Sequence, residues 1–191
     1  MNSLDMIWGV SFLLGISLLF LVFKKPEIQI KRPKLGVFGA DIIYTDQKEK
    51  YKAPDIEYGK ILYSEKYDLQ GKPDYIFQKR WSKNLIPVEL KSGTINEDDI
   101  RPHEGDMMQL AAYFLIIEDV YNKRPKEGRL IYSNYMFIIR NTWKLRRKTK
   151  QILAEMRDML KTGEQNVNPS FVKCRYCICR DTVCEHYNGE D

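Results

Sequence analysis

The residues best suited to chemistry are two carboxylates and a lysine on neighbouring predicted strands. Asp74 ends the motif Gly-Lys-Pro-Asp, and Glu89 and Lys91 flank Leu90 in the next apolar run. Side chains alternate along a strand, so Glu89 and Lys91 point to one face while Leu90 faces the core. In a hairpin, Asp74 can lie across from them. Two carboxylates and a backbone carbonyl make a hard oxygen site that suits Mg²⁺ or Mn²⁺.

A lysine beside such a metal site can orient or deprotonate water and stabilise a phosphate under attack. These groups together are the equipment for hydrolysing a phosphodiester. The pattern is short, and ordinary surface charge on a hairpin explains the same residues.

A second pair of polar residues follows on the next predicted element. Gln109 and Tyr113 are four positions apart on a predicted helix, so they share one face. A Gln-x-x-x-Tyr pair near a metal site can hold a phosphate and the backbone of a bound strand. Taken singly, Tyr113 is more typical of a core residue and Gln109 of a solvated one.

All four cysteines lie close together near the C-terminus. Cys174, Cys177, Cys179 and Cys184 place four thiols within eleven residues. In a reducing cytosol they are poor candidates for structural disulfides. Four thiolates can bind a 4Fe–4S cluster or a tetrahedral Zn²⁺, and the spacing alone slightly favours zinc.

The longest apolar run lies at the N-terminus. Residues 6–23 contain no charge, and at 1.5 Å per residue they span about 27 Å as a helix, which predicts a transmembrane anchor over 1–25. No Lys or Arg precedes the run and no small-residue cleavage site follows it, which favours an anchor over a secretory signal or a buried core helix. Lysines that follow the run place the remaining chain in the cytoplasm by the positive-inside rule. They can also contact anionic lipid heads or form a solvated linker.

Composition sets the broad class. The 191 residues include 31 Lys and Arg against 26 Asp and Glu, 43% hydrophobic residues and 30% charged residues. These values exclude a disordered chain and a polytopic membrane protein, and the length allows one domain plus a tail. The formal charge of +5 permits a nucleic-acid partner without demanding one.

Hydrophobic periodicity predicts an α/β domain with a mixed sheet after a polar linker at 26–36. Strands are expected at 37–44, 60–63, 72–80, 85–92 and 129–140, and helices at 99–122 and 143–161. The strands at 72–80 and 85–92 are expected to form a hairpin. Asn141 or Thr142 can cap the final helix, whose first turns are dense in cations that either contact DNA or form a solvated face.

The order Gly-Lys-Pro-Asp, Glu-Leu-Lys-Ser-Gly, Gln-x-x-x-Tyr and then cysteines resembles one family. It is similar to the PD-(D/E)XK nucleases, and within them to the RecB-like, CRISPR-associated exonucleases that carry an iron–sulfur cluster. The resemblance covers roughly residues 58–184, and its most specific stretches are LYSEKYDLQGKPDYIF and LIPVELKSG. It implies a restriction-endonuclease-like core, a mixed sheet flanked by helices, over residues 37–191.

The resemblance also implies roles for single residues. It assigns metal binding to Asp74, Glu89 and the Leu90 carbonyl, catalysis to Lys91, DNA positioning to Gln109 and Tyr113, and a 4Fe–4S cluster to Cys174, Cys177, Cys179 and Cys184. Such a cluster pins the C-terminal segment to the nuclease core. Family members cut single-stranded DNA from an end, and some trim fragments that become CRISPR spacers. Single-stranded DNA and CRISPR adaptation or repair proteins are therefore the implied partners.

The chain departs from the family pattern at two places. The family usually has a metal-binding histidine upstream of the Gly-x-x-Asp strand, whereas His103 and His186 both lie downstream. Glu57 or Glu65 could substitute for that ligand, and His103 is expected to lie on the surface at the helix N-terminus. Related nucleases take one cluster cysteine from far upstream, whereas here Cys179 could supply the fourth ligand.

The leading hypothesis is a metal-dependent deoxyribonuclease tethered to the membrane with its nuclease domain in the cytoplasm. The anchor suggests a role in defence against incoming DNA. One alternative is a catalytically weak or inactive module that holds nucleic acid without cutting it. Another is a membrane-attached adaptor with a four-cysteine zinc site.

Overall fold

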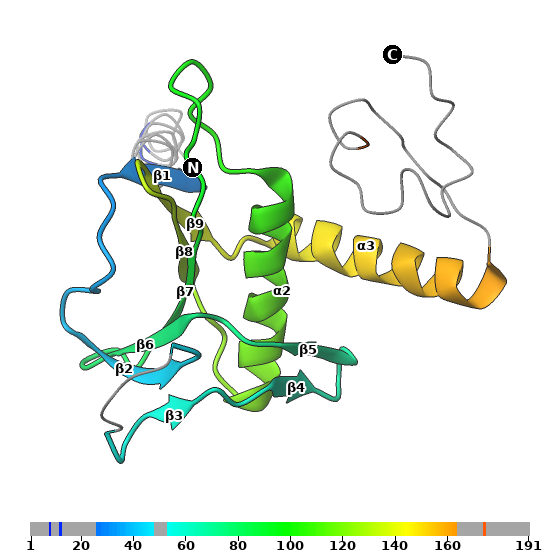
Figure 1. The fold of residues 1–191 in the computed structure, drawn as a ribbon, viewed down its shortest axis with the longest axis horizontal. Helices are drawn as coiled ribbons and strands as arrows, with labels where there is room; N and C mark the ends of the chain where they lie inside the picture. Colours follow the sequence, from blue (N-terminus) through cyan, green and yellow to red (C-terminus); the bar gives the residue numbers. More distant parts are fainter. Residues whose placement is uncertain (1–7, 9–11, 13–25, 48–52, 164–173, 175–191) are drawn as a thin grey trace. The chain divides into compact units, whose positions relative to one another are not determined.

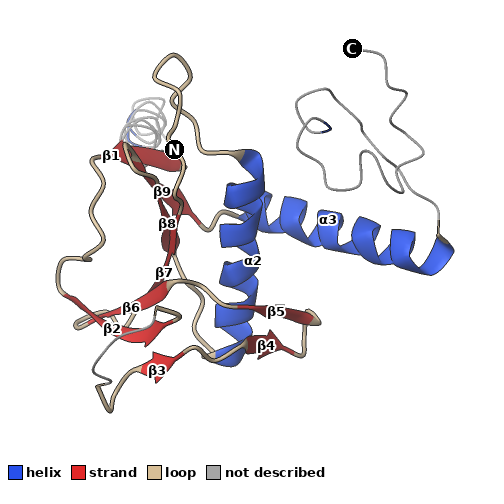
Figure 2. Cartoon of the chain, in the orientation of Figure 1, coloured by secondary structure: helices blue, strands red, loops and turns tan. Residues whose placement is uncertain are grey.

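A computed structural model of the chain describes residues 8, 12, 26–47, 53–163 and 174. The chain forms two compact units that meet in sequence between Arg146 and Arg147, and the sheet belongs to the first. Figure 1 shows the path of the chain, and Figure 2 separates its helices from its strands.

Seven strands form one mixed sheet in the order β1-β9-β8-β7-β6-β2-β3 (Figure 1). Neighbouring strands are antiparallel except for the parallel pairs β2–β3 and β7–β8. This arrangement confirms the expected α/β class with a mixed sheet. The strand bounds are β1 Ile28–Lys31, β2 Ala40–Thr45, β3 Glu57–Tyr58, β6 Tyr75–Lys79, β7 Leu85–Leu90, β8 Glu127–Ile131 and β9 Met136–Arg140. A separate two-stranded sheet pairs β4 Leu62–Ser64 with β5 Leu69–Gly71.

The β6–β7 hairpin confirms the strand pairing expected from the sequence. Tyr75 pairs with Val88 and Gln78 with Leu85 in an antiparallel register. Continuing this register by one residue places position 74 across from position 89. The hairpin therefore brings the two expected carboxylates to the same end of the strand pair.

Helix α2, Glu104–Val120, connects the parallel strands β7 and β8 and packs on one face of the sheet (Figure 2). Parallel neighbours require such a crossover. The helix begins five residues later than expected, because Pro102 disfavours helical geometry in the residue before it. Leu110 and Phe114 are fully buried against the sheet, and Gly128 in β8 permits their close approach.

Helix α3, Trp143–Thr162, agrees with its predicted range to within one residue. Its first turn is capped by Thr142, whose Oγ1 accepts a hydrogen bond from the Leu145 amide at 3.2 Å. An ion pair of 2.6 Å between Arg146 and Glu118 ties that first turn to α2. The cap was one of the two expected from the sequence.

Two expectations for the strands were wrong. Residues 129–140 form two strands, β8 and β9, because Ser133 and Asn134 make a turn between them. Asn134 fixes that turn by accepting from the Ile95 amide and donating to the Ile95 carbonyl. The linker expected at 26–36 contains β1, which pairs with β9 along the sheet edge.

Both ends of the chain carry expectations that fall largely outside the described residues. The apolar segment 6–23 is described only at Trp8 and Phe12, and the cysteine cluster only at Cys174, which is half-buried. Within the described part of the chain, no helix has the length and apolar character needed to cross a bilayer.

Candidate active site

The hairpin and the chain beside it hold the first carboxylate in place. Asp74 Oδ2 accepts a hydrogen bond of 2.7 Å from the Leu90 amide, and Oδ1 accepts one of 2.8 Å from Gln47 Nε2. The backbone of Leu90, the expected third ligand, therefore lies directly against Asp74. Both oxygens of this carboxylate are oriented before any ligand enters.

Lys91 is held by three oxygen atoms. Its Nζ lies 2.6 Å from Gln109 Oε1, 3.1 Å from Asp106 Oδ1 and 3.2 Å from Glu89 Oε1. Burial alone would lower the pKa of Lys91, but hydrogen bonds to Asp106 and Glu89 outweigh burial and raise this pKa. The side chain is thus a charged ammonium in a fixed position.

Helix α2 adds the Gln-x-x-x-Tyr pair to the same site. Gln109 Nε2 donates to Glu89 Oε1 at 2.8 Å and to the Tyr113 hydroxyl at 2.9 Å. The Tyr113 hydroxyl donates in turn to the Lys72 carbonyl at 3.2 Å. Gly71 makes room for this ring, because a Cβ there would lie 2.8 Å from Tyr113 Cε1.

The five side chains predicted for the site therefore come together from three consecutive elements. Asp74 precedes β6, Glu89 and Lys91 lie at the end of β7, and Gln109 and Tyr113 lie on α2. Glu89, Lys91, Gln109 and Tyr113 form one continuous hydrogen-bonded network. Asp74 lies next to this network, because it accepts a hydrogen bond from the amide of Leu90, which lies between Glu89 and Lys91.

One carboxylate oxygen of Glu89 lacks a partner among the described residues, and a cation bound there would stabilise its negative charge. The residue is 7% exposed, and its Oε2 is buried without a hydrogen-bond partner. Burial raises the pKa of Glu89, and the nearby negative charge of Asp74 raises it further. A buried carboxylate oxygen without a donor, close to a second carboxylate, is a position that a bound cation would stabilise.

The oxygen atoms available at the site are of the type that binds a hard divalent cation. In the described part of the chain, no group of three or more His, Cys, Asp or Glu side chains could hold a metal ion. The protein ligands of a metal here would thus be two carboxylates and backbone oxygen. Mg²⁺ commonly binds through one or two carboxylates and keeps water or phosphate oxygen in its other positions.

Sequence reasoning missed Asp106 and Gln47. Asp106 accepts from Lys91 through Oδ1 and from the Tyr132 hydroxyl through Oδ2, the latter at 2.6 Å. Asp106, Gln109 and Tyr113 follow a three- and four-residue spacing on one helix face, which was the available signal. Gln47 has no such signal, because it reaches Asp74 from another part of the chain.

Glu57, one of the two residues that could substitute for the missing histidine, has partners outside the site. Glu57 pairs with Lys60 at 3.3 Å and accepts a hydrogen bond of 3.4 Å from the Tyr121 hydroxyl. Glu65 is exposed. His103 is exposed just before α2, as expected, with its ring edge against Tyr132 at 5.7 Å between centroids.

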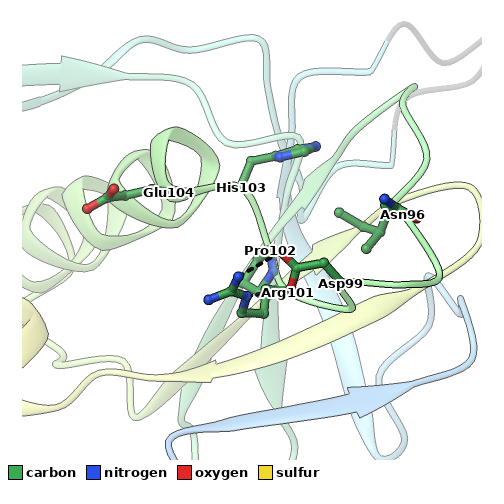
Figure 3. A pocket seen from close by; sticks show the side chains of 7 residues that line it. Asn96, Asp99, Arg101, Pro102, His103 and Glu104 are labelled. Carbon is green, nitrogen blue, oxygen red and sulfur yellow. Dashed lines mark hydrogen bonds and ion pairs between the residues drawn. The ribbon is translucent and has the colours of Figure 1, made fainter. Parts of the chain in front are cut away.

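A cavity of about 380 Å³ lies beside the start of α2 (Figure 3). It is lined by the loop from Ile95 to Glu104, and an Arg101–Asp99 ion pair lies along it. Charges of both signs line this cavity, so it does not favour an anion or a cation.

No family model matches the chain, and no curated protein matches it significantly.

Proposed function

We propose that the chain is a metal-dependent deoxyribonuclease of the PD-(D/E)XK type. The observation that carries the proposal is the assembly of Asp74, Glu89, Lys91, Gln109 and Tyr113 in one site. Ordinary surface charge on a hairpin gives no reason for Gln109 of the following helix to bond both Glu89 and Lys91. The β6–β7–α2–β8 segment that presents them supports a restriction-endonuclease-like core.

Asp74, Glu89 and the Leu90 carbonyl would hold Mg²⁺ or Mn²⁺ in this proposal. The bound ion would supply Lewis acidity toward a phosphate oxygen and lower the pKa of attacking water. The protein contributes the orientation of the carboxylates. Hydrogen bonds from Gln47 and the Leu90 amide fix Asp74, and those from Gln109 and Lys91 fix Glu89 Oε1.

Lys91 acts as a fixed positive charge rather than as a base. A neutral amine has only two N–H donors, whereas three acceptors surround this nitrogen. A scissile phosphate that enters the site can replace one of these acceptors. The ammonium then stabilises charge that develops on the phosphate oxygens during hydrolysis.

Gln109 and Tyr113 position the DNA strand. Their polar groups sit between the carboxylates and the Lys72 carbonyl, and both can exchange these internal partners for a phosphate oxygen. Single-stranded DNA attacked from an end is the proposed substrate, in keeping with the RecB-like resemblance.

The test is cleavage of end-labelled single-stranded DNA in Mg²⁺ or Mn²⁺ by the full chain. Asp74→Ala and Lys91→Ala should each abolish products while circular dichroism shows an unchanged fold. Lys60→Ala is the matched control, because Lys60 is an exposed lysine paired with Glu57 outside the site. Cleavage that survives Asp74→Ala or Lys91→Ala would refute the assignment.

A second candidate is a module that binds nucleic acid without cutting it. It is favoured by the small metal set, since the described residues include no group of three or more His, Cys, Asp or Glu side chains that could hold a metal ion. A tight complex with single-stranded DNA and no products in either metal would support this candidate.

We also propose that Cys174, Cys177, Cys179 and Cys184 bind a 4Fe–4S cluster, with zinc as the alternative. Visible absorption and metal analysis after anaerobic purification separate the two, since a colourless protein with one zinc would exclude the cluster. Membrane attachment through residues 1–25, a cytoplasmic nuclease domain and CRISPR adaptation or repair partners complete the proposal. If the purified protein contains zinc at the four cysteines and does not cleave DNA, the zinc adaptor replaces the nuclease as the proposed function.

A further inference from the structure

Two neighbouring turns at the far end of the β6–β7 hairpin each expose an aromatic side chain. Phe38 is 97% exposed and Trp81 is 96% exposed. The Arg80 amide donates to the Gly39 carbonyl at 2.9 Å, so the two turns lie side by side. Two aromatic rings that leave nearly all their surface in water at one place are unusual, because such rings are normally buried.

The backbone holds both turns in shape. The Ala40 amide donates to the Val37 carbonyl at 3.2 Å, and Gly39 takes the left-handed φ of 65° that this tight turn uses. In the other turn, the Lys83 amide donates to the Lys79 carbonyl at 2.9 Å, and Lys83 also has a left-handed φ of 53°. These constraints keep the aromatic rings at the tips of well-defined turns.

The chain around the two rings is strongly basic. Residues 34–41 and 79–83 contain four Lys or Arg against one carboxylate, Asp41. Arg80 already pairs with Asp41 at 2.7 Å, so the remaining cations are not balanced within these two segments. Exposed aromatic rings surrounded by Lys and Arg suit the surface of an anionic bilayer. Aromatic rings favour the membrane–water interface, and the cations favour the anionic headgroups.

We propose that Phe38 and Trp81, with Lys34 and Lys83, form an aromatic tip that docks onto an anionic phospholipid surface. The first ring of the tip, Phe38, lies thirteen residues after the segment 1–25 that is expected to anchor the chain. Docking at the tip is a second contact of the folded domain with lipid. It does not depend on whether the chain cleaves DNA.

The position of the tip determines where the candidate active site lies when the tip is docked on lipid. Five or six strand residues separate it from Asp74 and Glu89, which at ~3.3 Å per residue is roughly 17–20 Å. A docked tip therefore leaves the candidate active site at the opposite end of the hairpin, away from the bilayer.

The test uses the full chain with Trp8→Phe and Trp143→Phe, which leaves Trp81 as the sole tryptophan. The protein is reconstituted in vesicles of phosphatidylcholine and phosphatidylglycerol, with or without brominated acyl chains. We expect Trp81 emission to shift to the blue and to be quenched by the brominated lipid, and less so in vesicles without phosphatidylglycerol.

Two further sets of variants make the result specific. Adding Trp81→Phe and Ile61→Trp moves the reporter to an exposed position outside the tip, 57% exposed, where brominated lipid should not quench it. Lys34→Glu with Lys83→Glu should lower the docked-to-undocked ratio at least about tenfold. Trp81 emission that ignores brominated lipid, or that responds to single-stranded DNA and not to lipid, would overturn the proposal.

Discussion

The two ends of the β6–β7 hairpin differ in burial, because one holds buried polar groups and the other exposes aromatic rings. At one end, Glu89 is almost fully buried and every donor of the Lys91 ammonium has an acceptor. At the other end, Phe38 and Trp81 lie in solvent among cations. Both ends belong to the same pair of short strands, so strand propensity cannot account for the difference.

The difference lies in what covers each end. Helix α2 contacts β7 and brings Asp106 and Gln109 over Lys91, so buried polar groups find partners and become fixed. At the tip, the described residues provide tight turns but leave both aromatic rings uncovered. A hairpin can thus present preorganised polar chemistry at one end and an adhesive apolar surface at the other.

The largest expected effect is at Glu89, where Glu89→Gln removes one charge and keeps the shape. Saturating Mn²⁺ at 100 times its Kd should stabilise the wild-type chain by about 2.7 kcal/mol, and this gain should disappear in the variant. Cleavage should fall about a hundredfold to a thousandfold, because a ligand of the proposed ion is lost. Thermal unfolding with and without Mn²⁺, and product formation, provide the two measurements.

Asp41→Asn is the control for this prediction at the opposite end of the hairpin. Asp41 is exposed and paired with Arg80, so metal stabilisation and cleavage in solution should remain at the wild-type level. Equal losses in Glu89→Gln and Asp41→Asn would show that the two ends do not differ in the proposed way.

The next effect tests how closely α2 must approach the site. In Gly71→Ala, the new Cβ would lie 2.8 Å from Tyr113 Cε1 and 3.2 Å from Ile116 Cδ1. The overlap should lower the free energy of unfolding by about 1–3 kcal/mol, as for other overpacked positions. Urea denaturation measures this value. Gly93→Ala is the matched control, because no heavy atom lies within 4 Å of its Cβ position, and an equal loss there would contradict the packing argument.

A smaller effect is expected at Asp106, which positions Lys91 without being a proposed metal ligand. Asp106→Asn keeps the size of the side chain and removes the charge opposite the ammonium. The turnover number should fall about tenfold, as for other residues that support a metal site from outside, while the Mn²⁺-induced stabilisation is kept. Asp119→Asn, which changes a carboxylate that binds Ser64 at 2.6 Å, should leave both values unaltered. Loss of Mn²⁺ stabilisation in Asp106→Asn would mean that Asp106 takes part in metal binding.

The sequence predicts part of the buried end of the hairpin and misses the rest. Alternation and motif spacing are local signals, and they predict that Asp74, Glu89 and Lys91 come together at one end of a strand pair, as the hydrogen bond from the Leu90 amide to Asp74 shows. To predict the role of Asp106, one must know which face of α2 meets Lys91, and this depends on tertiary contacts.

Errors in the predicted strands have the same origin. Apolar residues on both sides of Ser133 and Asn134 look like one strand until the turn is seen to be held by Ile95. β1 lies in a segment with prolines at 26 and 33, and only its pairing with β9 makes it a strand. Contacts between distant segments decide such cases.

The smallest expected effect belongs to the tip. Trp81→Ser removes a ring that is 96% exposed, so the free energy of unfolding should change by no more than about 0.5 kcal/mol. Cleavage of single-stranded DNA in solution should also be unchanged, because the ring lies at the end of the hairpin opposite to Asp74 and Glu89. Urea denaturation and a solution nuclease assay measure both. A destabilisation comparable to that of Gly71→Ala would show that the Trp81 ring packs within the fold, and the contrast between the two ends would no longer hold.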